Sequence, residues 1–135
     1  RHNSGTENPM IYTSYFRKAM HHPDAVAITR SIPKGFRGPR FMELAPPKHL
    51  FGLNNPELFR TRYREEVLSK LNPQAIAAKS EGRILLCYEG PGKFCHRQVV
   101  AEWLREEAGA EVEEWPGEET EDGKPAEGPE QLALF

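Results

Sequence analysis

The chain has 135 residues, of which 38% are hydrophobic, and a formal net charge of −2 at pH 7. This length suits one compact domain with appendages and excludes a second full domain. No apolar run approaches the length needed to cross a bilayer, and two cysteines indicate neither secretion nor a disulfide framework. We therefore expect a cytoplasmic protein without membrane association.

The charge is divided unequally along the chain. Residues 1–110 carry 17 basic and 11 acidic groups, net +6, whereas residues 111–135 carry one basic and nine acidic groups, net −8. A basic domain of this kind is compatible with a phosphate-bearing ligand or nucleic acid as partner.

Composition divides the chain into four parts. We interpret residues 1–9 as a tag or disordered leader and residues 10–115 as a single α/β domain. Residues 116–130 contain no apolar side chain larger than Ala and no periodicity, which predicts a flexible acidic linker. Residues 131–135 are apolar again and are interpreted as a partner-docking peptide.

The first half of the domain is expected to hold two strands and a long loop. Residues 10–16, MIYTSYF, favour a first strand that ends in the hydroxyls of Thr13 and Ser14, and residues 25–29, AVAIT, favour a second. Residues 31–49 are dense in Pro, Gly and basic side chains and favour neither a long helix nor a central strand. Long loops of this kind usually line binding sites.

Two helices are expected next. Asn55 is a helix cap followed by Pro56 at the first helical position, and the pattern continues to Leu71. Asn72-Pro73 ends this helix, and residues 73–81 predict a second, shorter one. The apolar side chains expected to share one face of the first helix are Leu58, Tyr63, Val67, Leu68 and Leu71.

The last part of the domain predicts a strand, a turn, a helix and a short strand. Residues 83–88, RILLCY, form a continuous apolar run typical of a buried strand. A helix follows from Cys95 or His96 and ends near Gly109, and residues 111–113 favour a last strand. Alternating strands and helices predict an α/β fold, a small mostly parallel sheet with helices on both faces in Rossmann-like layering.

The turn between the buried strand and the last helix is the predicted active site. Ligands of open α/β folds bind beyond the carboxyl ends of the strands, where loop amides and a helix N-terminus favour anions. A Cys95 thiol close to a helix N-terminus and to cations is favoured as thiolate, and therefore as nucleophile. Arg97 and Lys93 would hold an anionic substrate, and Glu89 or His96 would move protons. The predicted site comprises catalytic Cys95, His96, Arg97 and Glu89, and ligand-binding Thr13, Ser14, Arg30 and Lys93.

Several other readings of the same residues stay open. In a purely structural one, Cys95 packs, His96 donates to a backbone carbonyl and Arg97 pairs with Glu89. In a second, Cys87 begins a phosphatase-like or sulfurtransferase-like anion loop, although Lys93 stands where guanidinium is required. In a third, a non-catalytic module binds anions through Lys34, Arg37, Arg40, Lys93 and Arg97.

Zinc is a further alternative. Cys87, Cys95 and His96 offer three ligands, and the fourth would have to come from His21, His22 or His49. Adjacent Cys-His with an offset of eight residues does not match the usual finger spacings. The sequence is therefore interpreted as that of a protein without a cofactor.

Two segments resemble known motifs. Cys87-Tyr88-Glu89, a short Gly/Pro insert and Cys95-His96-Arg97 before an amphipathic helix resemble the signature of the family catalogued as domain of unknown function 488, over residues 10–115. The resemblance implies a small α/β domain of Rossmann-like layering whose polar residues gather at one site, and it supplies no reaction.

The last five residues, QLALF, resemble the peptide by which many bacterial replication and repair proteins dock on the sliding clamp. Gln131 would hydrogen-bond at the rim of a groove, while Leu132, Leu134 and Phe135 would bury apolar area in it. Ala133 replaces the usual small polar residue. The alternative is that this C-terminus folds back onto its own domain.

Together these features predict a bacterial or phage protein associated with DNA repair or replication. It would act on a nucleotide or nucleic acid at the Cys-His-Arg turn and would be recruited to the bacterial DNA sliding clamp by its C-terminus.

Overall fold

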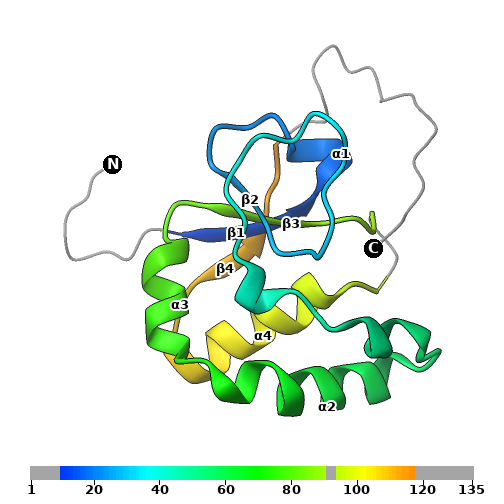
Figure 1. The fold of residues 1–135 in the computed structure, drawn as a ribbon. Coiled ribbons are helices and arrows are strands. Elements are labelled where there is room, and N and C mark those ends of the chain that lie inside the picture. The colour runs from blue at the N-terminus through cyan, green and yellow to red at the C-terminus, as the bar shows by residue number, and fades with distance from the viewer. Residues whose placement is uncertain (1–9, 91–93, 118–135) are drawn as a thin grey trace.

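A four-stranded parallel sheet forms the centre of the molecule in a computed structural model that describes residues 10–90 and 94–117 (Figure 1). The strands pair in the order β2-β3-β1-β4, and every pair is parallel. Their bounds are Ile11–Tyr15 for β1, Ala25–Ala27 for β2, Ile84–Cys87 for β3 and Val112–Glu114 for β4. The predicted parallel α/β sheet is confirmed.

The central strands are buried on both faces. Val26 and Leu85 belong to the larger hydrophobic cluster, whereas the neighbouring Ala27 and Leu86 belong to a second cluster on the opposite face. This alternation is the period of two expected for side chains along a strand. Because both faces pack against other elements, the sequence of β3 reads as an uninterrupted apolar run.

Helices cover both faces of the sheet, as predicted (Figure 1). Three of them, α2 (Pro56–Glu66), α3 (Pro73–Ser80) and α4 (His96–Ala108), lie on one side, and α4 packs directly on β1, β3 and β4. The short α1 (Phe16–Ala19) lies on the other side. Val99, Val100 and Leu104 of α4 are fully buried against the larger cluster.

The predicted Asn55 cap is confirmed, and Asn72, which was expected only to end the preceding helix, is a second cap. The Asn55 side-chain oxygen accepts hydrogen bonds from the backbone N–H groups of Glu57 (2.9 Å) and Leu58 (3.1 Å), and Pro56 follows at the first helical position. Asn72 caps α3 in the same way. At the far end of α4, Gly109 adopts the left-handed conformation (φ 67°) that ends the helix.

Removal of one cap should lower stability by a known amount. We expect Asn55→Ala to reduce the free energy of unfolding by about 1 kcal/mol, because two amide donors of the first turn of α2 lose their acceptor. Chemical denaturation monitored by circular dichroism measures the change. Asn54→Ala, one residue before the cap, is the control and should change stability by less than about 0.5 kcal/mol.

Helix α2 differs from its prediction in two respects. It ends at Glu66 and gives way to a 3₁₀ turn at Leu68–Lys70 instead of continuing to Leu71. The expectation that Leu58 is buried is wrong, since 42% of it is exposed, whereas only 8% of Phe59 is exposed. Phe59 and Tyr63 lie four residues apart and face the core, which fixes the rotation of the helix and turns Leu58 to solvent.

The remaining predictions need small corrections. The first strand ends at Tyr15, and Phe16 opens the unpredicted helix α1. The segment 31–49 holds no long helix or central strand, as expected; it contains the 3₁₀ turn Met42–Leu44, the first residues of another, Lys48–Gly52, and a single parallel bridge from Arg40 to Ala27. In the described part of the chain, none of the helices has the length and apolar character to cross a membrane.

Candidate functional site

The candidate site lies at the junction between the end of β3 and the start of α4, at the carboxyl edge of the sheet. Cys87 is the last residue of β3 and pairs in register with Tyr15, the last residue of β1. The helices that follow these two neighbouring strands, α1 and α4, cover opposite faces. Such a reversal at the strand ends is where open α/β sheets bind ligands. Cys95 occupies the N-cap position of α4 without a capping hydrogen bond from its side chain, and His96 and Arg97 lie in the first turn.

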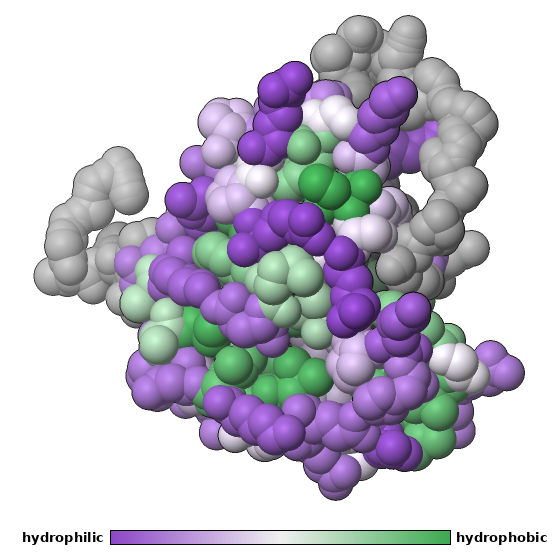
Figure 2. Space-filling view, in the orientation of Figure 1, coloured by the Kyte–Doolittle hydropathy of each residue, from purple (hydrophilic) through white to green (hydrophobic). Residues whose placement is uncertain are grey.

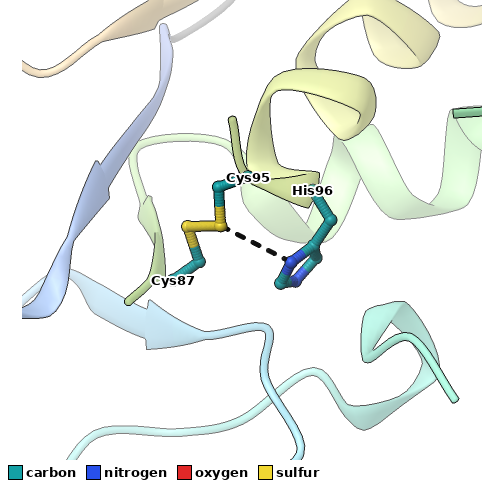
Figure 3. Close-up of side chains that lie close together, drawn as sticks. All are labelled: Cys87, Cys95 and His96. Atoms are coloured by element: carbon teal, nitrogen blue, oxygen red, sulfur yellow. Dashed lines mark hydrogen bonds between the residues drawn. A yellow bond between two sulfur atoms is a disulfide. The ribbon is translucent and has the colours of Figure 1, made fainter. Parts of the chain in front are cut away.

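The two cysteines are joined to each other in this structure. Figure 3 shows the Cys87–Cys95 disulfide between the end of β3 and the start of α4. Both residues are buried, with 0% and 4% of their surface exposed. The number of cysteines, which suggested no disulfide framework, did not predict this bond; the fold brings together two residues that lie eight positions apart in sequence.

His96 points its ring toward the sulfur atoms (Figure 3). Its Nε2 lies 2.7 Å from the Ile28 carbonyl oxygen, which only accepts hydrogen bonds, so the ring proton is on Nε2. The proton-free Nδ1 therefore faces Cys95 Sγ, 3.7 Å away. The hydrogen bond from His96 to a backbone carbonyl that the purely structural alternative predicted is present.

The environment of His96 keeps the imidazole uncharged. Burial lowers the pKa of His96 to about 4, the charge of Arg97 acts in the same direction, and the hydrogen bond to Ile28 opposes both. The ring also packs edge-to-face against Tyr63, with 5.7 Å between the centroids. At neutral pH, His96 is therefore an acceptor or a ligand through Nδ1.

Arg97 is committed to other groups of the protein. Its side chain is only 3% exposed and forms a two-pronged ion pair with Glu114, Nε to Oε1 at 3.3 Å and Nη2 to Oε2 at 3.0 Å. Nη1 donates to Cys87 Sγ (3.0 Å) and to the backbone carbonyl of Glu89 (2.6 Å). Arg97 therefore positions Cys87, and its acidic partner is Glu114 and not the predicted Glu89.

Glu114 was missed by the sequence analysis, although its position follows from the strand pattern. It pairs in register with Thr13, whose hydroxyl donates to Glu114 Oε1 (2.8 Å). Val112 is buried under α4, so the side chain two residues later faces the same side of the sheet. The chain of contacts Thr13, Glu114, Arg97 and Cys87 links three strands to α4.

The other predicted ligand-binding residues are not gathered together. Thr13 and Ser14 are neighbours on β1 and point to opposite faces, and the buried Ser14 hydroxyl has no hydrogen-bond partner among the described residues. Arg30 is exposed on the loop after β2. Lys93 lies outside the described residues, as do Gln131, Leu132, Leu134 and Phe135.

A basic loop lies close to the site. Its exposed cations are Arg30, Lys34, Arg37 and Arg40. Arg40 donates to the Arg30 carbonyl (2.7 Å). Tyr88, the residue after Cys87, interacts with two residues of this loop. Burial raises the pKa of Tyr88, whereas a hydrogen bond with Ser31 and the charge of Arg40 lower it. Ser31 and Arg40 therefore lie beside the end of β3. On the face of the molecule over which the loop runs in Figure 1, hydrophilic side chains lie between hydrophobic patches (Figure 2).

The three groups with metal-ligating atoms lie together. Cys87 Sγ, Cys95 Sγ and His96 Nδ1 or Nε2 are within 4.8 Å of one another, and all three residues are buried. None of the histidines considered from the sequence as a fourth ligand belongs to this group. His22 Nδ1 accepts a hydrogen bond from the Asp24 amide (2.9 Å), and His49 pairs with Glu66 (2.6 Å). Among the described residues, the group therefore has three protein ligands.

Comparison with known proteins identifies the family. A family model described as "DUF488-N3a: Active DUF488-N3 subclade" matches residues 17–108, which include β2, β3, α4 and both cysteines. No curated protein and no solved structure matches the chain. The match spans most of the domain and the whole strand-to-helix junction described above, and the chain belongs to the DUF488 family.

Proposed function

We propose that this protein is an enzyme that acts on a nucleotide or nucleic acid at the Cys87, Cys95 and His96 site. The observation that carries the proposal is the 3.7 Å contact of Cys95 Sγ with the proton-free Nδ1 of His96 at the carboxyl edge of a parallel sheet. The subclade that the chain matches is described as active, which supports a catalytic role.

The reactive form is the reduced one. Reduction of the disulfide by a thiol gives two cysteines, and each then has a feature that favours thiolate. Cys87 receives a hydrogen bond from the Arg97 guanidinium, and Cys95 stands at the positive end of α4. Oxidised protein is expected to be inactive, because neither sulfur is then a nucleophile or a ligand.

The charge around the site favours a phosphate-bearing substrate. The exposed guanidinium groups of Arg30, Arg37 and Arg40 lie on the loop next to Tyr88, whereas Arg97 is already paired with Glu114. Exposed cations beside a strand end attract phosphates, and the excess of positive charge in residues 1–110 adds to that attraction. In this proposal the loop binds the substrate, and Arg97 orders the cysteine.

A substrate screen tests the proposal. Reduced full-length protein would be incubated with nucleotides and with DNA and RNA oligonucleotides, and products followed by chromatography and mass spectrometry. We expect Cys95→Ser and His96→Gln each to reduce turnover at least about a hundredfold, within the range for loss of a proton-transfer group. His49→Gln, which changes an exposed histidine paired with Glu66, is the control.

Two outcomes would reject the catalytic role. Turnover at the wild-type rate in both site variants, with unchanged circular dichroism, would remove Cys95 and His96 from the reaction. Tight, strongly salt-dependent binding of nucleic acid without turnover would instead identify a non-catalytic binding module.

A second candidate reaction is supported by one contact. A phosphatase-like or sulfurtransferase-like loop needs guanidinium beside its nucleophile, and Arg97 supplies it at 3.0 Å from Cys87 Sγ, where the sequence offered only Lys93. In that case Cys87 should react with an alkylating probe faster than Cys95. Faster reaction of Cys95 would reject it.

The C-terminal peptide is the proposed means of recruitment. We expect deletion of residues 131–135 to abolish binding to a bacterial sliding clamp and to change the melting temperature by less than about 1 °C, because the peptide would contact only the partner. Surface plasmon resonance measures the first quantity and calorimetry the second. A variant with the same five residues in scrambled order is the control for charge and length; a large fall in melting temperature on deletion would indicate docking on the protein's own domain.

A further inference from the structure

We propose that the reduced protein binds one Zn²⁺ through Cys87 Sγ, Cys95 Sγ and His96 Nδ1. These residues come from the end of β3 and the start of α4, and their ligand atoms lie within 4.8 Å of one another (Figure 3). Two thiolates and an imidazole are ligands that select zinc over magnesium or calcium. The inference deepens the proposed function by naming a cofactor; its catalytic consequence rests on that function, whereas zinc binding does not.

The distance between Cys95 and His96 already fits zinc. Tetrahedral coordination with Zn–S of about 2.3 Å and Zn–N of about 2.1 Å places sulfur and nitrogen about 3.6 Å apart. Cys95 Sγ and His96 Nδ1 are 3.7 Å apart. The separation of these two ligand atoms therefore already matches the separation that a shared zinc ion requires.

Both sulfurs become available as ligands only on reduction, because each is bonded to the other in the oxidised protein. A thiol reductant supplies two electrons and two protons, breaks the bond between Cys87 and Cys95, and is itself oxidised to a disulfide. Zinc then displaces the two thiol protons to solvent and holds the sulfurs about 3.8 Å apart in tetrahedral geometry. Disulfide and zinc are mutually exclusive states of this site.

The surroundings of the three ligands are those of a metal site. The ring nitrogen that does not face the sulfurs, His96 Nε2, donates its proton to the Ile28 carbonyl at 2.7 Å. A contact of this kind usually orients a ligating histidine. Arg97 donates to Cys87 Sγ, and Glu114 neutralises Arg97 in turn. The charges then balance. The two thiolates neutralise Zn²⁺, and the Glu114 carboxylate neutralises the Arg97 guanidinium, so the buried site holds zinc without net charge.

Three protein ligands leave one coordination position for water or a substrate atom. Structural zinc sites are closed by four protein ligands, whereas catalytic ones keep a position open. Among the described residues the group contains no fourth ligand. A zinc ion held by these three residues alone belongs to the open class, and in that state the two thiolates serve as ligands.

Titration with Co²⁺ tests this inference on the full chain. Co²⁺ is a spectroscopic probe that takes the place of zinc, and thiolate coordination gives it intense charge-transfer and tetrahedral absorption bands. Protein reduced with a phosphine without oxygen should bind one Co²⁺ per chain, and Zn²⁺ should displace it. Cys87→Ser, Cys95→Ser and His96→Gln should each weaken binding at least about a hundredfold, more than loss of an outer-shell partner does.

Two controls keep the result independent of folding and of activity. His49→Gln should leave Co²⁺ binding unchanged, and oxidised wild-type protein, which carries no substitution, should bind none. The inference is overturned if reduced wild-type protein binds neither Co²⁺ nor Zn²⁺ at micromolar concentration, or if binding survives oxidation or the cysteine substitutions. Metal binding without turnover would reject only the proposed function, and turnover by metal-free protein would reject only a catalytic role of the metal.

Discussion

Replacing Arg97 by alanine is expected to lower the free energy of unfolding by about 3 kcal/mol. The change empties the volume of a side chain that is 3% exposed and removes the donors to Cys87 Sγ and the Glu89 carbonyl. Glu114 is about half exposed, so its carboxylate regains water and limits the loss. Urea denaturation of the oxidised protein measures the change.

A second ion pair provides the matched comparison. Arg64 pairs with Glu106 at 2.8 Å between α2 and α4, but both side chains are partly exposed. Arg64→Ala should cost no more than about 1 kcal/mol, because surface pairs are screened by solvent. Equal losses in the two variants would contradict the conclusion that burial makes the Arg97 contacts strong.

The stability of the oxidised protein should fall by about 2 kcal/mol between pH 7.5 and pH 5 because of His96 alone. The unfolded chain takes up a proton at the ordinary histidine pKa of 6.5, whereas burial lowers the pKa of folded His96 to about 4. Between these values the unfolded state binds more protons, so acidification favours unfolding. The full effect, about 3.4 kcal/mol for a difference of about 2.5 pKa units, is reached only below pH 4. Denaturation in a pH series with a chelator measures it.

The control for this pH dependence is another histidine. His96→Gln should remove most of the slope between pH 7.5 and pH 5, since glutamine does not titrate and still donates to the Ile28 carbonyl. His49→Gln should retain the slope, because this change on the surface leaves His96 and its contacts in place. A slope that is unchanged in His96→Gln would show that another group takes up the proton.

The helices and strands could be predicted to the extent that local signals specify them. Asn55-Pro56 and Asn72-Pro73 mark two helix starts, Gly109 marks a helix end, and the apolar run before Cys87 marks a buried strand. The rotation of α2 could not be predicted, because either Leu58 or Phe59 satisfies the pattern and packing against α4 decides between them.

The sequence predicted where the site lies in the fold but not which groups contact its side chains. The sequence located Cys95, His96 and Arg97 at a strand-to-helix junction, because short-range order determines that. It did not reveal the partners, since the Ile28 carbonyl, the Cys87 sulfur and the Glu114 carboxylate reach these side chains only through the strand order β2-β3-β1-β4. The same limit explains why the sequence did not favour a zinc site. The rules on ligand spacing describe ligands within one local loop, whereas here the fold brings the ligands together.

The Arg97–Glu114 ion pair depends on β4, the last strand of the chain to be synthesised among those described. As the chain leaves the ribosome, both sulfurs and the imidazole emerge before Glu114, which arrives only with the strand that follows α4. Until that strand joins the edge of the sheet beside β1, the guanidinium of Arg97 lacks its carboxylate. A chain that ends before residue 112 therefore lacks both the carboxylate that pairs with Arg97 and the strand that pairs with β1.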